Sequence, residues 1–243
     1  MIRAENLGKK YGGRMVVEKV SFDVSPGATL CLIGPSGCGK TTILKMLNRL
    51  VTPDEGRVLT EGRDISLKDP VALRRSMGYV SQQGSLFPHW TIRRNIGLVP
   101  RLEKWPKERI LSRTEELLAL VKLEPVDYLQ KYPHEMSGGE QQRVNIARAL
   151  AVDPPVLLMD EPFSALDPLT RLSLRREFLE IKKKLNKTTV FVTHDLEEAF
   201  EMADHILLMD SGRMMQYGTV NELKDSPANE FVSTFINTWN HVG

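Results

Sequence analysis

Short apolar runs of strand length alternate with segments of helical periodicity along most of the chain. Residues 16–24 alternate between apolar and polar positions at Val20, Phe22 and Val24, which predicts a half-buried strand. A Ser-Pro-Gly turn then leads into the continuously apolar run 28–33, a predicted buried strand. Further strands are predicted around residues 57–59, 78–81, 155–159, 188–193 and 206–209, and helices at residues 40–50, 169–185 and 196–202. This alternation predicts an α/β fold with a parallel sheet that is covered on both faces.

Three stretches carry the helical pattern most clearly. Residues 91–151 have the pattern of helices. Within this region Pro106 is placed to begin a helix whose apolar residues recur at helical spacing: Ile110, Leu111, Leu117, Leu118 and Val121. We interpret this region as an inserted helical subdomain. The predicted helix at 40–50 carries its apolar stripe at Ile43, Leu44, Leu47 and Leu50. The last segment, 228–239, spaces Phe231, Phe235 and Trp239 four residues apart, and its shortness favours a helix docked on the core over a membrane or partner helix.

A complete G-x-x-x-x-G-K-[ST] sequence follows the apolar run 28–33 and precedes the predicted helix. Phosphate oxygens need several N–H donors that converge from one side, and glycines let the backbone curl around them. A glycine-rich turn is the alternative, but the strand before the motif and the helix after it favour nucleotide binding. The residues predicted to bind the nucleotide are Gly34, Pro35, Ser36, Gly37, Cys38, Gly39, Lys40, Thr41 and Thr42. Lys40 is expected to face the β- and γ-phosphates of the nucleotide, and Thr41 to ligate Mg²⁺.

Composition and charge narrow the class of protein. The 243 residues are 41% hydrophobic and 26% charged, which is typical of a soluble globular protein. The net charge of +2 gives no long-range attraction to nucleic acid or anionic lipid, so we expect no nucleic-acid partner. For the same reason, we expect any association with a membrane to depend on a protein partner. No run approaches 18 apolar residues, and the start lacks the apolar core of a secretion signal. The chain is therefore expected to be cytoplasmic.

The two cysteines are expected to be free thiols. Cys31 lies in a predicted strand and Cys38 in the glycine-rich loop, and no second cysteine pair or histidine cluster accompanies them to form a zinc site. The loop amides and Lys40 stabilise anions, which favours a lowered pKa and faster reaction at Cys38 than at Cys31. A packed, inert thiol is the alternative, and the sequence does not decide between them.

Two carboxylates close the predicted strand that ends at Met159. Asp160 stands at the strand tip, where a carboxylate can hold the Mg²⁺ that bridges the phosphates of a nucleotide. Glu161 follows one residue later and can polarise an attacking water as a general base. Solvated carboxylates are common at strand ends, so this pair carries weight only together with the phosphate loop.

A second anion-binding element is predicted at Ser137, Gly138, Gly139 and Glu140, directly before a helical run. Ser137 and Glu140 fit a capping box, but a cap does not explain the two glycines. Glycines beside the exposed amides of a helix start permit the close approach of an anion. Since one chain does not need two sites for the same γ-phosphate, we infer that this element serves the nucleotide of a second subunit.

Taken together, these residues resemble the ATP-binding cassette ATPases over essentially the whole chain. The order of motifs in that family matches an adenine-stacking aromatic at Tyr11, the phosphate loop, a glutamine at Gln82, the signature at residues 137–140, the Asp-Glu pair, an S-A-L-D loop that ends at Asp167, and His194. The resemblance implies a P-loop NTPase (RecA-like) core with an antiparallel β subdomain and an inserted α-helical subdomain. It divides the chain into core and β subdomain at 1–90, helical subdomain at 91–151, second part of the core at 152–225 and a C-terminal helix at 226–243.

The resemblance also implies roles and partners. The chain is expected to hydrolyse ATP with Mg²⁺ as a head-to-tail homodimer, with the signature acting in trans and Asp167 linking the two sites. Gln82 is expected to reach Mg²⁺ and water, and His194 to contact the γ-phosphate and orient Glu161. One departure is Glu140, where the family's commonest residue is glutamine. The added negative charge puts its contact with the ribose in doubt.

Finer resemblance indicates the ATPase subunit of a bacterial importer, peripheral on the inner face of the plasma membrane. The stretch from Gln82 through Gln83, Gly84 and Ser85 to residue 89 resembles the loop that receives the coupling helix of a permease. Residues 46–50, 69–75 and 99–105 resemble importers of osmoprotectants such as glycine betaine, choline, carnitine or proline, which also use a solute-binding protein. Importers of other small solutes, such as a polyamine, amino acid or inorganic anion, remain the alternative, and a non-transport cassette ATPase is less favoured. No paired nucleotide-sensing modules follow in the sequence, so regulation through such modules is not expected.

Overall fold

The computed structural model describes residues 2–82 and 86–240 and divides the chain into two compact units. One unit holds residues 1–74 and 188–243, and the other holds residues 75–187. Gln83, Gly84 and Ser85 of the sequence analysis lie outside the described residues.

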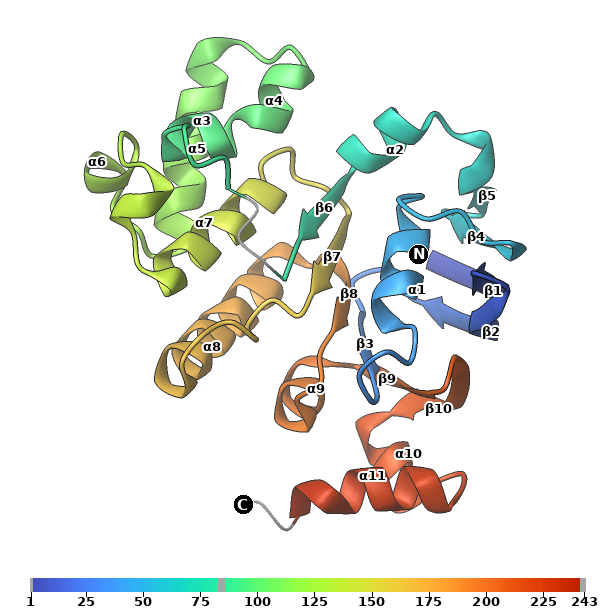
Figure 1. Cartoon of the computed structure of the whole chain (residues 1–243). Coiled ribbons are helices and arrows are strands. Elements are labelled where there is room, and N and C mark those ends of the chain that lie inside the picture. The colour runs from blue at the N-terminus through green and yellow to red at the C-terminus, as the bar shows by residue number, and fades with distance from the viewer. Residues whose placement is uncertain (1, 83–85, 241–243) are drawn as a thin grey trace. The chain divides into compact units, whose positions relative to one another are not determined.

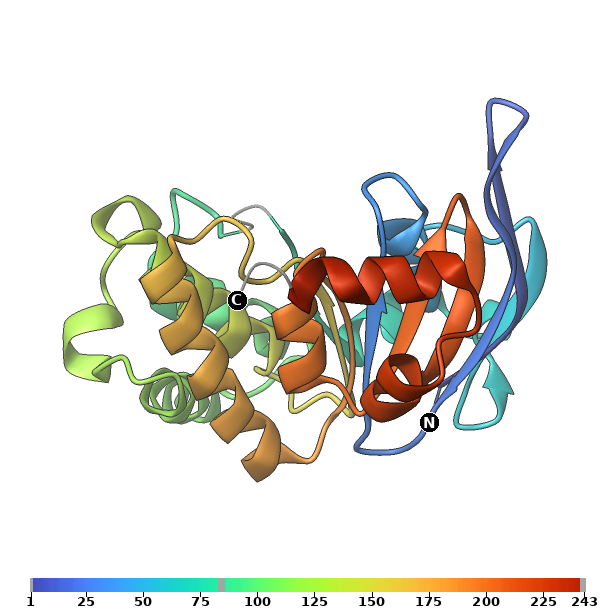
Figure 2. The same cartoon turned by 90° about the horizontal axis from the view of Figure 1, so that it is seen from below.

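The first unit holds two groups of strands (Figure 1). Its elements are β1 (Ile2–Tyr11), β2 (Arg14–Val24), β3 (Thr29–Ile33), α1 (Lys40–Leu47), β4 (Glu55–Thr60), β5 (Arg63–Asp64), a 3-10 turn (Ile65–Leu67), β8 (Thr188–Val192), α9 (Leu196–Met202), β9 (His205–Asp210), β10 (Arg213–Thr219), α10 (Val220–Asp225) and α11 (Glu230–Asn240). Helix α2 (Pro70–Arg75) ends at the division between the units. Strands β2, β1, β4 and β5 pair in that order as an antiparallel sheet, with β1 and β2 forming a long hairpin (Figure 2).

The phosphate-loop strand β3 lies at the centre of the second group, in the order β10, β9, β3, β8. It pairs in parallel with β8, where Leu32 lies opposite Val192, and with β9, where Leu32 lies opposite Leu207. All five residues of β3 and all five of β8 are buried, which explains why both segments are continuously apolar or β-branched. Burying each large aliphatic side chain contributes about 1.5–3 kcal/mol. The base of the phosphate loop is therefore held on a rigid core strand.

The second unit is mainly helical. Its elements are β6 (Met77–Val80), α3 (Ile92–Ile96), α4 (Leu98–Leu102), α5 (Lys107–Leu120), α6 (Pro125–Tyr128), a 3-10 turn (Pro133–Glu135), α7 (Gly138–Ala149), β7 (Val156–Asp160) and α8 (Pro168–Leu185). Strands β6 and β7 pair in parallel, with Gly78 opposite Leu157. Helix α7 packs against α3, α5 and α8 through buried side chains that include Val144 and Ile146. This packing fixes the start of α7, where the predicted signature lies.

Most of the strands and helices that the periodicity predicted lie within one or two residues of their expected bounds, with one correction in α1. Ile43, Leu44 and Leu47 are buried as predicted, but Leu50 is 50% exposed. The helix ends at Leu47, and Arg49 adopts a left-handed φ of 57°, so the chain turns before Leu50 can continue the stripe. At the other end of the chain, α11 buries Val232 and Ile236, while the side chain of Trp239 lies outside the described part.

Candidate functional site

The phosphate loop leaves the carboxyl end of β3 and enters α1, as the motif predicted. Gly34 has φ 147°, and a Cβ there would lie 2.1 Å from the carbonyl oxygen of Met209. Gly39 has φ 105°, and a Cβ there would lie 2.6 Å from the carbonyl oxygen of Val16. Both backbones are too close to their neighbours for any side chain, so the two invariant glycines of the motif have a packing reason as well as a conformational one.

Lys40 projects its ammonium back across the loop that precedes it. Its Nζ donates to the carbonyl oxygens of Gly34 at 2.7 Å and Pro35 at 2.9 Å, and the residue is only 6% exposed. The nearby thiol of Cys38 lies 3.8 Å from the same nitrogen. A single positive charge is thus held within the loop by neutral acceptors. A phosphate oxygen can replace these carbonyl groups as a stronger, charged acceptor.

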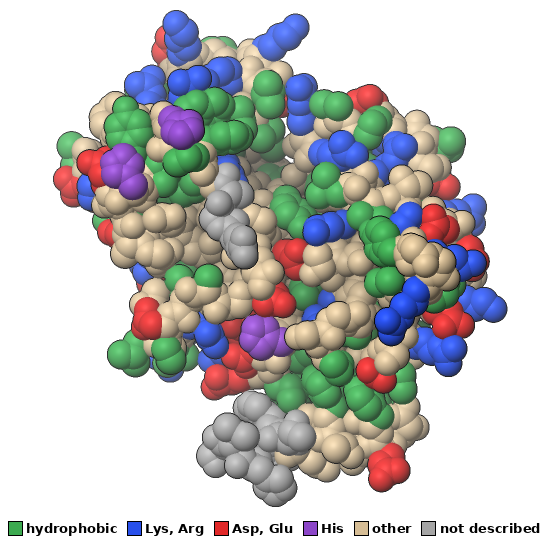
Figure 3. Space-filling view, viewed as in Figure 1, with side chains coloured by type: hydrophobic (Ala, Val, Ile, Leu, Met, Phe, Trp, Pro, Cys, Tyr) green, Lys and Arg blue, Asp and Glu red, His purple; other side chains and the backbone are tan. Residues whose placement is uncertain are grey.

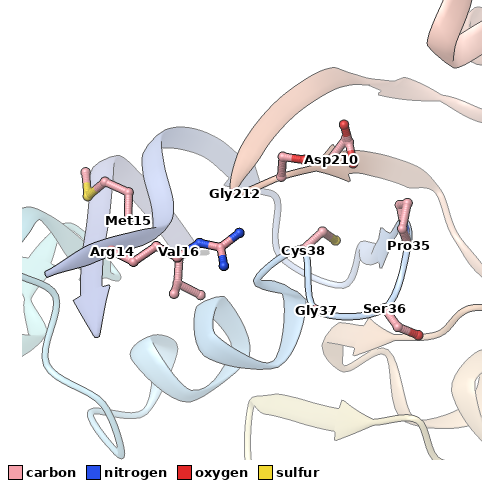
Figure 4. Close-up of a pocket in the computed structure, with 10 residues that line it drawn as sticks. Arg14, Met15, Val16, Pro35, Ser36, Gly37, Cys38, Asp210 and Gly212 are labelled. Carbon is pink, nitrogen blue, oxygen red and sulfur yellow. The ribbon is translucent and has the colours of Figure 1, made fainter. Parts of the chain in front are cut away.

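A cavity of about 350 Å³ opens beside this loop (Figure 4). It is lined by residues 14–16 of β2, residues 35–38 of the loop, Asp210 at the end of β9 and residues 211–212 of the turn that follows. Figure 4 shows the guanidinium of Arg14 directed toward the side of the cavity where Cys38 lies. Arg14 and Asp210 cannot be singled out from the sequence, because a single charged residue beside a turn has no pattern that distinguishes it from an ordinary surface residue. Together they place one charge of each sign at the cavity.

The thiol of Cys38 does not have the lowered pKa that the loop environment favoured. The residue is 3% exposed, and this burial raises the pKa of the thiol above its ordinary value, although Lys40 acts in the opposite direction. Cys31 is fully buried in β3, and burial raises the pKa of its thiol still further. Desolvation of the thiolate therefore outweighs the nearby ammonium. Both cysteines are free thiols, as expected.

In the second unit, β7 ends at Asp160, and Glu161 follows with a left-handed φ of 45°. Asp160 is 6% exposed, and the hydroxyl of Tyr79 on β6 donates to its Oδ2 at 3.4 Å. Burial, followed by the charge of Asp160, raises the pKa of Tyr79, so the phenol stays protonated as a donor. The amide of Gln82 donates from Nε2 to Oε2 of Glu161 at 3.0 Å. The structure thus brings three predicted site residues, Gln82, Asp160 and Glu161, to one sheet end.

The capping box at the start of α7 is formed as predicted. Oγ of Ser137 accepts from the backbone N–H of Glu140 at 3.4 Å, and Oε2 of Glu140 accepts from the backbone N–H of Ser137 at 2.8 Å. Gly138 is exposed, with only Leu166 near the position of a Cβ at 3.7 Å. Gly139 packs closely, because a Cβ would lie 2.6 Å from Cγ2 of Thr170 on α8. The helix start is therefore accessible at Ser137 and Gly138.

The remaining predicted residues stand at element ends. Tyr11 ends β1 and is 48% exposed, with the Lys9 ammonium 5.6 Å from its ring centroid. His194 is exposed and follows Thr193, whose hydroxyl donates to buried Glu198 at 2.6 Å. Thr41 and Thr42 lie half-buried in the first turn of α1.

Asp167 caps α8. Its Oδ1 accepts from the backbone N–H of Thr170 at 3.1 Å, and this bonding lowers the pKa of the carboxyl. A carboxylate at a helix N-terminus also interacts favourably with the helix dipole. Asp167 therefore has a structural role as the N-cap of α8. The S-A-L-D pattern alone did not predict this role.

The loop after the undescribed residues 83–85 is fixed by the buried side chain of Asn95. Its Nδ2 donates to the carbonyl oxygens of Phe87, Trp90 and Thr91, and its Oδ1 accepts from the N–H of Phe87 at 2.8 Å. A second cavity, of about 380 Å³, lies next to this loop. Among the described residues its lining is basic, with no acidic side chain: Thr91, Arg93, Arg94, Arg101, Lys107 and Ile110. Figure 3 shows Lys and Arg side chains gathered over the region of α4 and α5.

Comparisons with known proteins show the family of this chain. A sequence model described as ABC transporter matches residues 17–164, more than half of the chain. The chain belongs to the ABC transporter family. The glycine betaine/carnitine/choline transport ATP-binding protein OpuCA of Bacillus subtilis is 53% identical over 237 residues, which are 97% of this chain and 62% of that protein. The glycine betaine uptake system ATP-binding protein YehX of Escherichia coli is 47% identical over 236 residues, 97% of this chain and 76% of that protein.

The ABC transporter fold is also found in solved structures. A dimeric post-hydrolysis state of the ATP-binding cassette MJ0796, bound to ADP and Pi, has a TM-score of 0.80 at 32% identity and covers 90% of this chain and 99% of that one. This confirms the predicted ABC ATPase fold. The chain spans about three fifths of the length of several curated relatives that it matches, with 62%, 62% and 59% of three of them covered.

Two features are absent from residues 2–82 and 86–240. No helix there combines the length and the apolar character needed to cross a bilayer. No three His, Cys, Asp or Glu side chains in that part of the chain cluster as ligands of a metal ion.

Proposed function

We propose that this ABC transporter chain binds and hydrolyses ATP. The observation that carries the proposal is the phosphate loop, in which two glycines pack against backbone carbonyls and Lys40 is held 2.7 Å from the oxygen of Gly34. Such a loop presents amide donors and one ammonium to a triphosphate. Residues 34–42 would hold the phosphates, and Tyr11 would stack on the adenine. The exposure of the Tyr11 ring supports this role, since an exposed aromatic face can accept a base.

The second unit holds Gln82, Asp160 and Glu161, and the first unit holds Thr41 and His194. Together these residues would supply the groups that hydrolysis needs. Glu161 would act as general base toward a water molecule, with Gln82 holding its carboxylate through the 3.0 Å hydrogen bond. His194 would contact the γ-phosphate. The hydroxyl of Thr41, the amide oxygen of Gln82 and the carboxylate of Asp160 are oxygen donors of the kind that Mg²⁺ prefers, so these residues fit a magnesium ion brought in with ATP. When bound, Mg²⁺ neutralises charge on the phosphates.

We further propose that two copies of the chain form a head-to-tail homodimer. The start of α7 is accessible at Ser137 and Gly138, so its backbone amides can bind an anion. Within one chain the phosphate loop would already bind the γ-phosphate, so this second site would serve another copy. Ser137 and Gly139 would therefore contact the γ-phosphate of the partner copy, and Asp167 would link the two sites. The dimeric structure of MJ0796 bound to ADP and Pi supports a dimer of this chain.

The transport role follows from the names of the relatives. We infer that the chain energises import through integral membrane permease subunits, from the cytoplasmic side of the membrane, with a solute-binding protein acting indirectly. The transport functions of OpuCA and YehX favour glycine betaine, carnitine or choline as the solute. The permease contacts the solute and sets its identity, so an importer of another small solute is the second candidate.

Mixing two defective variants tests the shared site. In a dimer of Ser137→Arg and Lys40→Ala chains, one composite site carries both changes and the other carries neither. We expect MgATP hydrolysis to reappear on mixing, while each variant alone is inactive. If the mixture hydrolyses no ATP and its mixed dimers bind none, the proposal of sites shared between chains is wrong.

Uptake measurements test the solute. Cells that contain the permease and the wild-type chain should accumulate labelled glycine betaine, choline or carnitine, and matched cells with Lys40→Ala should not. Labelled proline, a polyamine and sulfate serve as comparisons. Lys40-dependent uptake of one of these comparison solutes, without uptake of any quaternary amine, would contradict the osmoprotectant assignment and leave the ATPase assignment intact.

A further inference from the structure

The carboxylate of Glu140 is shared by donors from two helices. The backbone N–H and the hydroxyl of Ser137 both donate to its Oε2 at 2.8 Å, and the hydroxyl of Tyr128 on α6 donates to its Oε1. Helices α6 and α7 lie in the same unit (Figure 1). The Tyr128 bond is the largest of the causes that lower the pKa of Glu140, so the group is a carboxylate at neutral pH. The capping box of α7 thus has an additional donor that sequence periodicity does not predict.

This arrangement has a consequence for the hydroxyl of Ser137. A serine hydroxyl has one proton to donate, and here that proton goes to Glu140. Under the proposed function, Ser137 must donate to the anionic γ-phosphate of the partner copy's nucleotide, because an anion accepts and does not donate. The hydroxyl therefore has to leave Glu140 when the dimer closes. A carboxylate close to a phosphate also repels it.

Tyr128 is held firmly in the place from which it reaches Glu140. The segment that follows it accepts two backbone hydrogen bonds, from the N–H of Ile92 to the oxygen of Lys131 at 2.8 Å and from the N–H of Arg93 to the oxygen of Leu129 at 3.1 Å. The ammonium of Lys131 lies 4.1 Å from the centroid of the Tyr128 ring. These contacts fix the phenol independently of Ser137.

The other charged groups near the carboxylate do not replace this donor. Lys131 lowers the pKa of Glu140 through its charge alone, and more weakly than the hydrogen bonds from Tyr128 and Ser137 do. Asp127 raises the pKa of Tyr128 and Arg143 lowers it. Arg143 is itself paired with Glu177, with its NH2 group 2.8 Å from Oε1. The phenol of Tyr128 is therefore the side chain that can satisfy Oε1 while Ser137 moves.

We propose that Tyr128 is a positioning residue that frees the Ser137 hydroxyl for the γ-phosphate by sharing the Glu140 carboxylate. Each donor to a carboxylate lowers its basicity, so a second donor weakens the hold on the first. When Ser137 turns toward phosphate, Tyr128 and the Ser137 N–H still satisfy Glu140, and no unpaired charge is left. This inference rests on the proposed function, since it assigns Tyr128 a part in the same signature site.

The test is a double-mutant cycle on the full chain with Tyr128→Phe, Glu140→Gln and the double variant. Turnover of MgATP, ATP affinity and thermal melting are measured for each. Tyr132→Phe is the matched control, because it removes a phenol hydroxyl from an exposed side chain four residues along the chain. We expect Tyr128→Phe to lower turnover about tenfold, the effect of one hydrogen bond to a charged group, with ATP affinity nearly unchanged. The same hydrogen bond is present in the resting chain, so the melting temperature should fall by about 2–4 °C, which leaves the chain folded. Tyr132→Phe should match the wild type.

The Glu140→Gln background distinguishes positioning from a structural role. An amide holds Ser137 less tightly than a carboxylate, so Tyr128→Phe should have little further effect on turnover in that background. An equal tenfold loss in both backgrounds would show that the phenol only supports the fold, and the proposal would be overturned. It is also overturned if Tyr128→Phe turns over ATP like the wild type, or if Glu140→Gln alone has no turnover. A wild-type chain that neither binds nor hydrolyses ATP would instead refute the proposed function itself.

Discussion

Adding one methyl group at Gly139 tests whether the start of α7 binds an anion or merely packs closely. Gly139 lies in the first turn of α7, and a Cβ there would meet Cγ2 of Thr170 on α8 at 2.6 Å. The residue does not have a positive φ, so alanine can adopt its backbone conformation. The substitution Gly139→Ala therefore separates a steric effect on packing from an effect on ligand approach.

Two opposing contributions set the change in the free energy of unfolding. Forcing an extra methyl into a packed contact costs about 1–3 kcal/mol, toward the low end here because Thr170 is half-buried and can change its rotamer. Alanine in place of glycine within a helix returns about 0.5–1 kcal/mol. We expect a net destabilisation of less than about 1 kcal/mol, too small to unfold the chain. The loss of turnover should be far larger, about 10²-fold, if the methyl also keeps a phosphate from the helix amides.

The companion variant Gly139→Ala/Thr170→Ser removes the clashing methyl from α8. The backbone N–H of residue 170 still donates to Asp167, so the cap of α8 is kept. Urea unfolding should show that stability returns to within about 0.5 kcal/mol of the wild type, while MgATP turnover stays low. Thr170→Ser alone serves as the control, with wild-type turnover. Recovery of turnover in the double variant would show that Gly139 is required for packing alone, and the reasoning about the anion would be refuted.

Three further predictions concern other parts of the chain. Glu161→Gln should lower turnover by about 10² or more at unchanged ATP affinity, because the new amide can still accept from Gln82 but cannot take a proton; near wild-type turnover would exclude Glu161 as the base. Hydrogen bonds from the N–H of Lys10 and from the ammonium of Lys9 lower the pKa of Asp54 in the folded chain. The Asp54 carboxylate therefore stabilises the fold above its unfolded pKa of about 3.9, and this stabilisation is lost as pH falls through its pKa in the folded chain. The melting temperature of Asp54→Asn should therefore fall below that of the wild type at pH 7 and approach it below about pH 4, whereas a constant difference would contradict the assignment. Cys38 should react with maleimide far more slowly in the native chain than in urea, since burial protects the thiol and raises its pKa; equal rates would show that the thiol is accessible.

The sequence predicted the elements whose signal is local. The phosphate-loop strand is a continuous apolar run, and the observed β3, Thr29–Ile33, lies within it. Helix α9 has the predicted bounds, Leu196–Met202, because Asp195 caps it and the chain becomes extended again at Ala203. Family membership and the ABC ATPase fold were also predicted, from the order and spacing of motifs, and both are confirmed. The domain bounds and the roles of the individual site residues stay predictions.

Elements with an irregular pattern were missed. Strand β1, Ile2–Tyr11, was not predicted because its pairing with β2 shifts register between Ala4 and Leu7 and again near Lys9, so its side chains do not alternate regularly. Strand β10, Arg213–Thr219, is half-buried or exposed over most of its length and therefore lacks an apolar run. Both strands depend on their partners more than on their own sequence.

The signature at residues 137–140 contains one interaction that the sequence predicts and one that it does not. Its capping box was predictable, since Ser137 and Glu140 stand three residues apart on one helix start. The Tyr128 bond was not, because it joins two helices across a turn and needs the backbone bonds that hold residues 129 and 131 against α3. Glu140 looked from sequence like a departure from glutamine that adds a repulsive charge. In the folded chain the Glu140 carboxylate accepts hydrogen bonds from Ser137 and Tyr128. The effect of having glutamate in place of glutamine therefore depends on Tyr128, a residue outside the motif.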